Sequence, residues 1–282
     1  SSDVCSSDLV ITDYAARSEA GFRRALRRAL GATPGAREAI VYVHGFNTSY
    51  SGGVFRLAQM MHDLSLPGVP VHFSWPSAAN PLGYTHDRDS VLYARDDLEK
   101  LLRAVRAAGA DRILLVGHSM GGLLVVETLR QMDIRTPGWA DRNGVSVVLI
   151  SPDIDVDVFR GQARAFATLP QPFAIFVSRR DPALRLSRQI NGSVDRLGDI
   201  DSARAVADLP VTLIDVSRFD ARKPHFALGT SPALIALLRG SDAIQTAFRR
   251  DRASRAGLLP GTVLTVQQAT EVILSPGLLL TD

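Results

Sequence analysis

Short apolar runs recur along the chain and alternate with longer segments of helical periodicity. The runs fall near residues 39 to 43, 70 to 74, 112 to 117, 145 to 150, 172 to 177 and 211 to 216. An amphipathic segment with Phe22, Leu26 and Leu30 on one face precedes the first run and predicts a helix. Strands that alternate with helices predict an α/β protein with a mostly parallel sheet and helices on both faces.

One of these strands runs directly into a serine flanked by glycines. The apolar residues 113 to 116 are followed by the letters GHSMGG at 117 to 122 and then by an apolar helix. This strand, turn and helix form the context of a nucleophile elbow, whose serine holds a strained backbone. We expect Gly117 and Gly121 to be required by sterics and Ser119 to present its hydroxyl above the sheet. An ordinary glycine turn is the alternative.

A nucleophilic serine on such an elbow works with a histidine and an acid that follow it in the chain. Of the six histidines, only His225 follows Ser119. It lies in a polar loop just after the strand near 211 to 216, which is where the general base belongs.

Two places compete for the acid. Asp181 follows the strand near 172 to 177 and is the first choice, because its carboxylate would lie at the carboxyl edge of the sheet. Asp153 and Asp155 follow the preceding strand and are the alternatives. A carboxylate that is not the acid is expected to cap the following helix.

A second glycine turn ends the strand near 39 to 43, with the letters HGFN. The backbone N–H of Phe46 in this turn is the candidate for one oxyanion donor, and the N–H of Met120 is the candidate for the other. Asn47 either contacts substrate or caps the helix that follows.

Residues 75 to 90 are expected to form a structureless loop that shapes substrate access. Tyr84 in this loop and Trp75 at its start are candidates for substrate contact. For Trp75, packing in the core is an equal alternative.

The ordered strings VHGFNTS, HFSWPS, GHSMGG, ISPDIDVDVF, FVSRRDPALRLS and HFAL resemble a bacterial α/β-hydrolase family of unknown biological role. The resemblance covers about residues 20 to 240. It implies the α/β-hydrolase fold and a serine-hydrolase triad carried by Ser119, Asp181 and His225. It implies no particular substrate.

The chain of 282 residues is long enough for one large core. Residues 1 to 10 repeat SSD and are interpreted as a remnant of cloning or sequencing, so any signal peptide is expected to be missing. The six predicted strands are fewer than the eight usual for the α/β-hydrolase fold, so amino-terminal strands are also expected to be missing. Residues 11 to 240 are expected to form the hydrolase domain. Residues 241 to 282 would be a carboxy-terminal extension that covers a sheet edge or binds a second subunit. The sequence does not indicate the cellular compartment of the protein.

Composition excludes several classes of function. The net charge is only +3 and no basic stripe is interleaved with aromatic residues, so nucleic-acid binding is not expected. Cys5 is the single cysteine, which leaves no thiolate set for a metal, and no cofactor is expected. A nucleotide-binding reductase is disfavoured because no G-x-G-x-x-G occurs. No apolar run is long enough to span a membrane.

The sequence therefore predicts a metal-free serine hydrolase, similar to esterases and lipases, that acts on a small-molecule ester or thioester. The alternative is a binding or scaffold protein that uses the same fold without catalysis. Such a protein would be expected to have lost parts of the triad, whereas serine, acid candidates and histidine are all present here.

Overall fold

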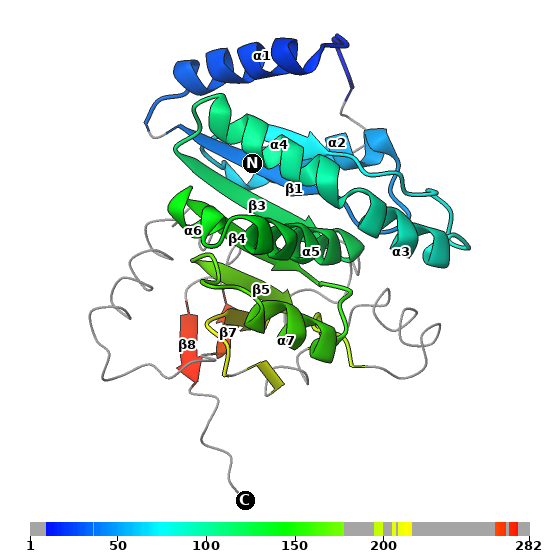
Figure 1. The fold of residues 1–282 in the computed structure, drawn as a ribbon, viewed down its shortest axis with the longest axis vertical. Helices are drawn as coiled ribbons and strands as arrows, with labels where there is room; N and C mark the ends of the chain where they lie inside the picture. The colour runs from blue at the N-terminus through cyan, green and yellow to red at the C-terminus, as the bar shows by residue number, and fades with distance from the viewer. Residues whose placement is uncertain are drawn as a thin grey trace, which may run out of the picture.

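The computed structural model describes residues 10–35, 37–177, 195–199, 205–206, 208–215, 263–268 and 271–275. Within them, an eight-stranded sheet has the order β2-β1-β3-β4-β5-β6-β7-β8 (Figure 1). Neighbouring strands from β2 to β7 pair in parallel, and β8 is antiparallel to β7. The strands are β1 (Glu38–Val43), β2 (Val69–Phe73), β3 (Arg112–His118), β4 (Val145–Ile150), β5 (Phe173–Val177), β6 (Thr212–Asp215), β7 (Val263–Gln268) and β8 (Glu271–Ser275). The predicted mostly parallel sheet is confirmed.

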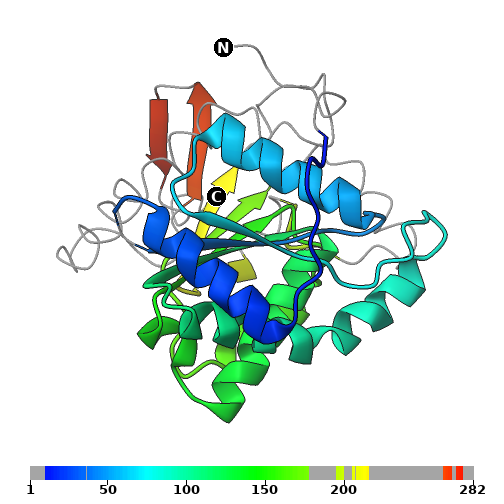
Figure 2. The same ribbon diagram turned by 90° about the horizontal axis from the view of Figure 1, so that it is seen from above.

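Helices cover both faces of this sheet. One face carries most of the described helices, and α2 lies on the opposite face, as the view from above shows (Figure 2). The helices are α1 (Glu19–Ala32), α2 (Tyr50–Leu64), α3 (Tyr84–Tyr93), α4 (Arg95–Ala107), α5 (Met120–Arg135), α6 (Trp139–Arg142) and α7 (Val156–Arg164). The predicted first helix is α1, which buries Leu26 and Leu30.

The central strands β1, β3, β4 and β5 are largely apolar because each contributes to two cores. In β3, Ile113 and Leu115 belong to the larger cluster beneath α4 and α5, whereas Leu114 and Val116 pack with the smaller cluster beneath α2. Each fully buried side chain of this kind contributes about 2 kcal/mol through the hydrophobic effect. A strand buried on both sides therefore reads as a continuous apolar run rather than an alternating one.

Register brings the carboxyl ends of three central strands level with one another. Val43 at the end of β1 pairs with Gly117 of β3, and His118 of β3 pairs with Ile150 at the end of β4. The turns that leave β1, β3 and β4 therefore start from one edge of the sheet.

The expectation of a structureless loop over residues 75 to 90 is wrong for residues 84 to 90, because these residues belong to α3, which starts at Tyr84. The helix buries Tyr84, Asp87, Ser90 and Val91 at helical spacing. Two of these four buried positions are polar, so the hydrophobic period that predicts a helix is absent from the sequence. Asp87 is satisfied by the loop before it, accepting hydrogen bonds from the Ser77 hydroxyl and the Ala78 N–H.

The apolar pieces near the carboxyl terminus extend the sheet. Residues 263 to 266 lie in β7, which pairs with β6, and residues 272 to 274 lie in β8. The pair covers the edge that β6 would otherwise present, which is one of the two roles expected for this segment.

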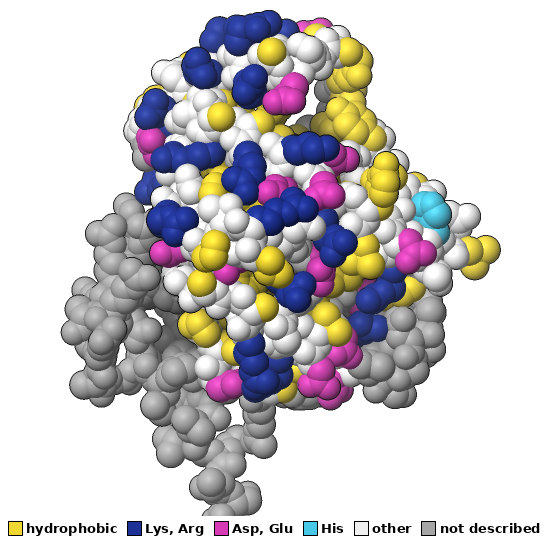
Figure 3. All heavy atoms as spheres, in the orientation of Figure 1, with side chains coloured by type: hydrophobic (Ala, Val, Ile, Leu, Met, Phe, Trp, Pro, Cys, Tyr) yellow, Lys and Arg dark blue, Asp and Glu magenta, His cyan; other side chains and the backbone are white. Residues whose placement is uncertain are grey.

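Basic and acidic side chains are interspersed over α4 and α5 (Figure 3). Arg135 lies 3.2 Å from Asp96 and 2.7 Å from Glu99, so it bridges the two helices. Among the described residues, no helix has both the length and the apolar character needed to cross a membrane.

His72 of β2 faces α2 at a position where the helix has a glycine. A Cβ added to Gly53 would overlap the imidazole ring. Both ring nitrogens are buried, and neither has a hydrogen-bond partner among the described residues. Burial, together with repulsion from His44, lowers the pKa of His72 to about 4. His72 is therefore neutral at pH 7.

This burial makes stability depend on pH. Folded His72 stays neutral until its pKa of about 4, whereas an unfolded histidine gains a proton below about pH 6.5. The unfolded state binds more protons between these values, so the free energy of unfolding falls as the pH drops through that window.

We expect His72→Gln to lose less stability than wild type between about pH 7 and about pH 4.5, measured by urea unfolding. His62→Gln, at an exposed histidine of α2, is the matched control and should keep the wild-type slope. Parallel curves for wild type and His72→Gln would show that His72 contributes nothing to the pH dependence.

Candidate active site

Ser119 occupies the sharp turn between β3 and α5. Its backbone has φ 51° and ψ −122°, a conformation that costs a non-glycine residue strain energy. Three backbone hydrogen bonds hold it: the Ser119 N–H donates to the Ile150 carbonyl, and the Ser119 carbonyl accepts from Gly122 and Asp153. The side chain is half-buried. This is the geometry of a nucleophile elbow.

The elbow requires glycine on both sides of the serine, as predicted. A Cβ on Gly117 would lie 2.8 Å from the Gly122 Cα. A Cβ on Gly121 would overlap the His44 carbonyl oxygen and lie 2.5 Å from that of Val43. The first turn of α5 thus rests directly on the backbone at the end of β1.

The turn after β1 packs against the elbow just as closely. A Cβ on Gly45 would lie 2.6 Å from His118 Nδ1 and 3.0 Å from Ser119 Cβ. Phe46 follows at once, half-buried against the larger core cluster. Met120 is the first residue of α5, whose opening N–H groups have no partner within the helix. The two candidate oxyanion donors therefore belong to segments that adjoin Ser119.

His44 and Trp75 fix the orientation of this turn. The Trp75 backbone N–H donates to His44 Nε2 at 3.2 Å, and the Trp75 indole N–H donates to the His44 carbonyl at 2.7 Å. The two rings stack with centroids 4.9 Å apart and planes 9° apart. Because Nε2 accepts a hydrogen bond, this pattern assigns the proton to Nδ1, which lies 2.9 Å from the Gly45 carbonyl and donates to it.

Burial lowers the pKa of His44 and so favours this neutral form. The Gly45 carbonyl is turned toward the His44 ring. In a trans peptide the carbonyl and the following N–H point in opposite directions, so the Phe46 N–H points away from that ring. These contacts between His44 and Trp75, here called the His44–Trp75 clamp, thus set the direction of the Phe46 N–H, the candidate oxyanion donor.

Asp153 and Asp155 have different surroundings. Asp155 caps α7, because its side chain accepts hydrogen bonds from the Asp157 and Val158 N–H groups. Asp153 is 3% exposed, accepts a 2.9 Å hydrogen bond from the Tyr84 hydroxyl and lies 3.4 Å from the Arg196 guanidinium. The capping role expected for a carboxylate outside the triad is thus observed at Asp155.

The three residues predicted to contact substrate are placed differently from one another. Asn47 is exposed and adopts a left-handed conformation with φ 53°. It does not cap α2, because the cap is Ser49, whose hydroxyl accepts a hydrogen bond from the Gly52 N–H. Trp75 and Tyr84 are 2% and 6% exposed, so both side chains lie in the core and not on a solvent-exposed surface where substrate could contact them.

Asp181 and His225 lie outside the described residues. The strands that precede them, β5 and β6, pair with each other in parallel, and β5 also pairs with β4. Both strands therefore end at the edge of the sheet that carries Ser119.

The sequence analysis did not identify two residues that lie near the elbow, His44 and Arg196. His44 directly precedes Gly45, and this adjacency was the available signal for a residue that orients the turn. Arg196 had no such signal, since nothing near it in the sequence indicates that it will meet Asp153.

A strained serine between a parallel strand and a helix, backed by the glycine turn of the neighbouring strand, defines a protein of the α/β-hydrolase class. The sequence matches the family described as alpha/beta hydrolase of unknown function (DUF900) over residues 18–239. The chain belongs to this family, which confirms the resemblance seen in its motifs.

Esterases are among the similar solved structures. Esterase B of Lactobacillus rhamnosis is 17% identical over 79% of this chain and 80% of its own, with a TM-score of 0.45. An esterase of Rhizomucor miehei is 13% identical over 78% and 76%, with a TM-score of 0.42. An esterase of Pyrococcus furiosus is 13% identical over 77% and 84%, with a TM-score of 0.41. No curated protein matches the sequence.

The contact between α5 and β1 predicts a large penalty for one added methyl group. Gly121→Ala should lower the free energy of unfolding by about 3 kcal/mol, because backbone atoms cannot move aside as side chains do. Gly161→Ala in α7, where an added Cβ meets no atom within 4 Å, is the matched control and should raise stability by up to about 1 kcal/mol. Urea unfolding measures both, and equal effects at the two sites would contradict the close approach.

Proposed function

We propose that the protein is a serine hydrolase, similar to esterases and lipases, that cleaves a carboxylic ester or thioester of a small molecule through an acyl-enzyme on Ser119. The observation that carries the proposal is the backbone of Ser119, held at φ 51° at the start of α5. A strained nucleophile position persists only where the surrounding structure enforces it, and such positions cluster at active sites.

In acylation, His225 takes the Ser119 proton as the Oγ atom attacks the carbonyl carbon. A bond forms between Oγ and carbon, and the carbonyl oxygen becomes an oxyanion. When the bond to the leaving group breaks, His225 returns the proton to the departing alcohol or thiol. In deacylation, His225 deprotonates a water that attacks the acyl carbon, and it then returns this proton to Ser119 Oγ as the bond between Oγ and carbon breaks and the carboxylic acid product leaves.

Asp181 holds the His225 imidazole in the required tautomer and stabilises its charged form. The Met120 and Phe46 N–H groups stabilise the oxyanion, and each such donor contributes about 3 kcal/mol to lowering the barrier. The contact of Gly45 with Ser119 and the His44–Trp75 clamp support this assignment of Phe46. Asn47, exposed beside the turn, is the remaining candidate for substrate contact. This chemistry needs neither metal nor cofactor.

Labelling with a fluorophosphonate probe tests the nucleophile and separates an enzyme from a scaffold on the same fold. We expect the wild type to be labelled and to hydrolyse short p-nitrophenyl esters, and Ser119→Ala to lose labelling and about four orders of magnitude in kcat. Ser51→Ala, at an exposed serine of α2, is the control and should react normally. A wild type that is neither labelled nor active would favour the scaffold.

The acid and the base are tested by kinetics. His225→Ala and Asp181→Asn should each lower kcat by about 10⁴, because triad members act as a unit. Asp155→Ala should keep the chemistry and lose about 1 kcal/mol of stability as a helix cap. A large kinetic loss in Asp155→Ala, with Asp181→Asn still active, would move the acid to the segment after β4.

A further inference from the structure

A buried charge pair lies directly behind the elbow. Asp153 and Arg196 are each 3% exposed, and the Arg196 Nε atom lies 3.4 Å from one carboxylate oxygen of Asp153. The other carboxylate oxygen accepts the 2.9 Å hydrogen bond from the hydroxyl of Tyr84, which is 6% exposed. A charge this deep in a protein is tolerated only with partners of this kind.

Three separate segments bring the members together. Tyr84 is the first residue of α3, and Asp153 follows β4. Arg196 arrives on residues 195–199, which run beside residues 152–156. Backbone N–H groups of Leu197 and Gly198 donate to the carbonyls of Ile154 and Pro152 at 2.8 and 3.0 Å. The backbone pairing fixes where the guanidinium enters, so the position of the charge does not depend on its long side chain alone.

Two contacts connect the network of Tyr84, Asp153 and Arg196 to the elbow and to the turn after β1. The Asp153 N–H donates to the Ser119 carbonyl at 3.2 Å. The Tyr84 ring meets the Phe46 ring edge to face, with centroids 5.5 Å apart and planes 66° apart. One chain of contacts therefore runs from Arg196 through Asp153 and Tyr84 to the residue whose N–H is the proposed oxyanion donor.

We propose that Asp153 is a positioning residue rather than the triad acid: paired with Arg196, it anchors the Tyr84 hydroxyl, and the Tyr84 ring holds Phe46 against the elbow. This inference rests on the proposed function, since Phe46 matters only if an oxyanion forms. A hydrogen bond to an ionised carboxylate is stronger than one between neutral groups, which suits an anchor. The His44–Trp75 clamp sets the direction of the Phe46 N–H, and Tyr84 sets its distance.

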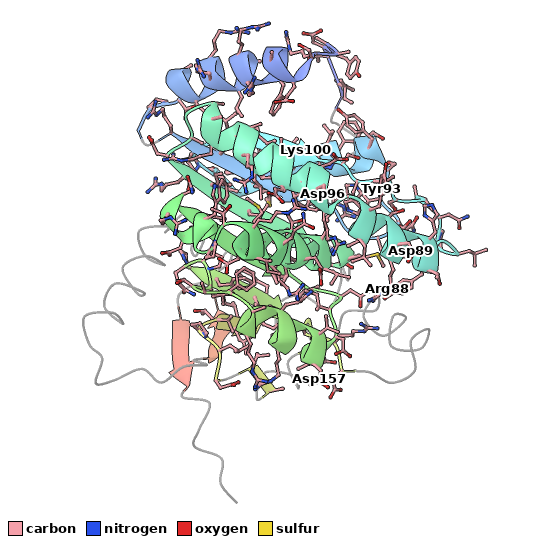
Figure 4. The ribbon with its side chains drawn as sticks, viewed as in Figure 1. Arg88, Asp89, Tyr93, Asp96, Lys100 and Asp157 are labelled. Atoms are coloured by element: carbon pink, nitrogen blue, oxygen red, sulfur yellow. The ribbon has the colours of Figure 1, made fainter. Side chains whose placement is uncertain are left out.

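Two substitutions at Tyr84 separate the hydroxyl from the ring. Tyr84→Phe keeps the ring and removes the anchor, so kcat for a p-nitrophenyl ester should fall about tenfold. Tyr84→Leu removes both and should approach the loss seen when an oxyanion donor is deleted, about a hundredfold. KM should stay within about twofold in both, because the oxyanion contact is made in the transition state and not with bound substrate. Tyr93→Leu, at the exposed end of α3 (Figure 4), is the control and should match wild type.

Substitution of the carboxylate distinguishes positioning from acid catalysis. Asp153→Asn should lower kcat about tenfold and leave the acidic limb of the kcat/KM pH profile in place, because that limb reports the histidine base. Asp157→Asn, on the exposed first turn of α7 (Figure 4), is the matched control. If Asp153→Asn does not fold because it leaves Arg196 without a counter-charge, the neutral pair Asp153→Asn with Arg196→Gln replaces it and should show the same tenfold loss.

The outcomes are distinct. A loss of about 10⁴ at Asp153, with a displaced acidic limb, would make Asp153 the triad acid and overturn the inference. So would Tyr84→Phe and Tyr84→Leu with kcat within about twofold of wild type. Fluorophosphonate labelling of the wild type separates the two levels: an unlabelled wild type overturns the proposed function and this inference with it, whereas a labelled wild type with unaffected Tyr84 variants overturns this inference alone.

Discussion

The contact between the end of β1 and the elbow is the constraint on which the site depends. Gly121 of α5 lies against the His44 carbonyl, and Gly45 of the β1 turn lies against Ser119 and the His118 side chain, so neither position has room for a Cβ atom. The parallel register of β1 with β3 brings the two turns level, and the Trp75 indole hydrogen bond holds the His44 carbonyl in place. Replacement of either glycine would move Ser119 away from the Phe46 N–H that is proposed to serve it.

Most strands of the fold were predictable from the sequence because a parallel strand that is buried on both faces consists of a continuous run of apolar residues. The observed bounds of β1 to β6 differ from the predicted runs by a residue or so at each end. The helix α3 was not predictable in this way, because its buried face includes Asp87 and Ser90, which are satisfied or enclosed by tertiary contacts. The cap of α2 also falls on Ser49 rather than Asn47, and such one-turn details depend on local backbone geometry.

The elbow was predictable because all of its parts are neighbours in sequence, from Gly117 to Gly121. The surroundings were not. Tyr84 and Asp153 are 69 residues apart, and their hydrogen bond exists only because α3 and the end of β4 meet behind Ser119. Sequence order placed Tyr84 in a substrate loop and Asp153 among the possible acids. The tertiary structure joins the two side chains by a hydrogen bond, a contact that no signal in the sequence indicates.

The backbone angles of Ser119 carry a consequence for how the family can change. A glycine at position 119 would adopt φ 51° and ψ −122° without the clash that a Cβ causes there, so the serine is kept at a cost of about 1–3 kcal/mol. Selection for stability alone would therefore favour glycine at this position. Under the proposed function, a relative with glycine at this position would have lost its nucleophile, and retention of serine there would reflect selection for activity over stability.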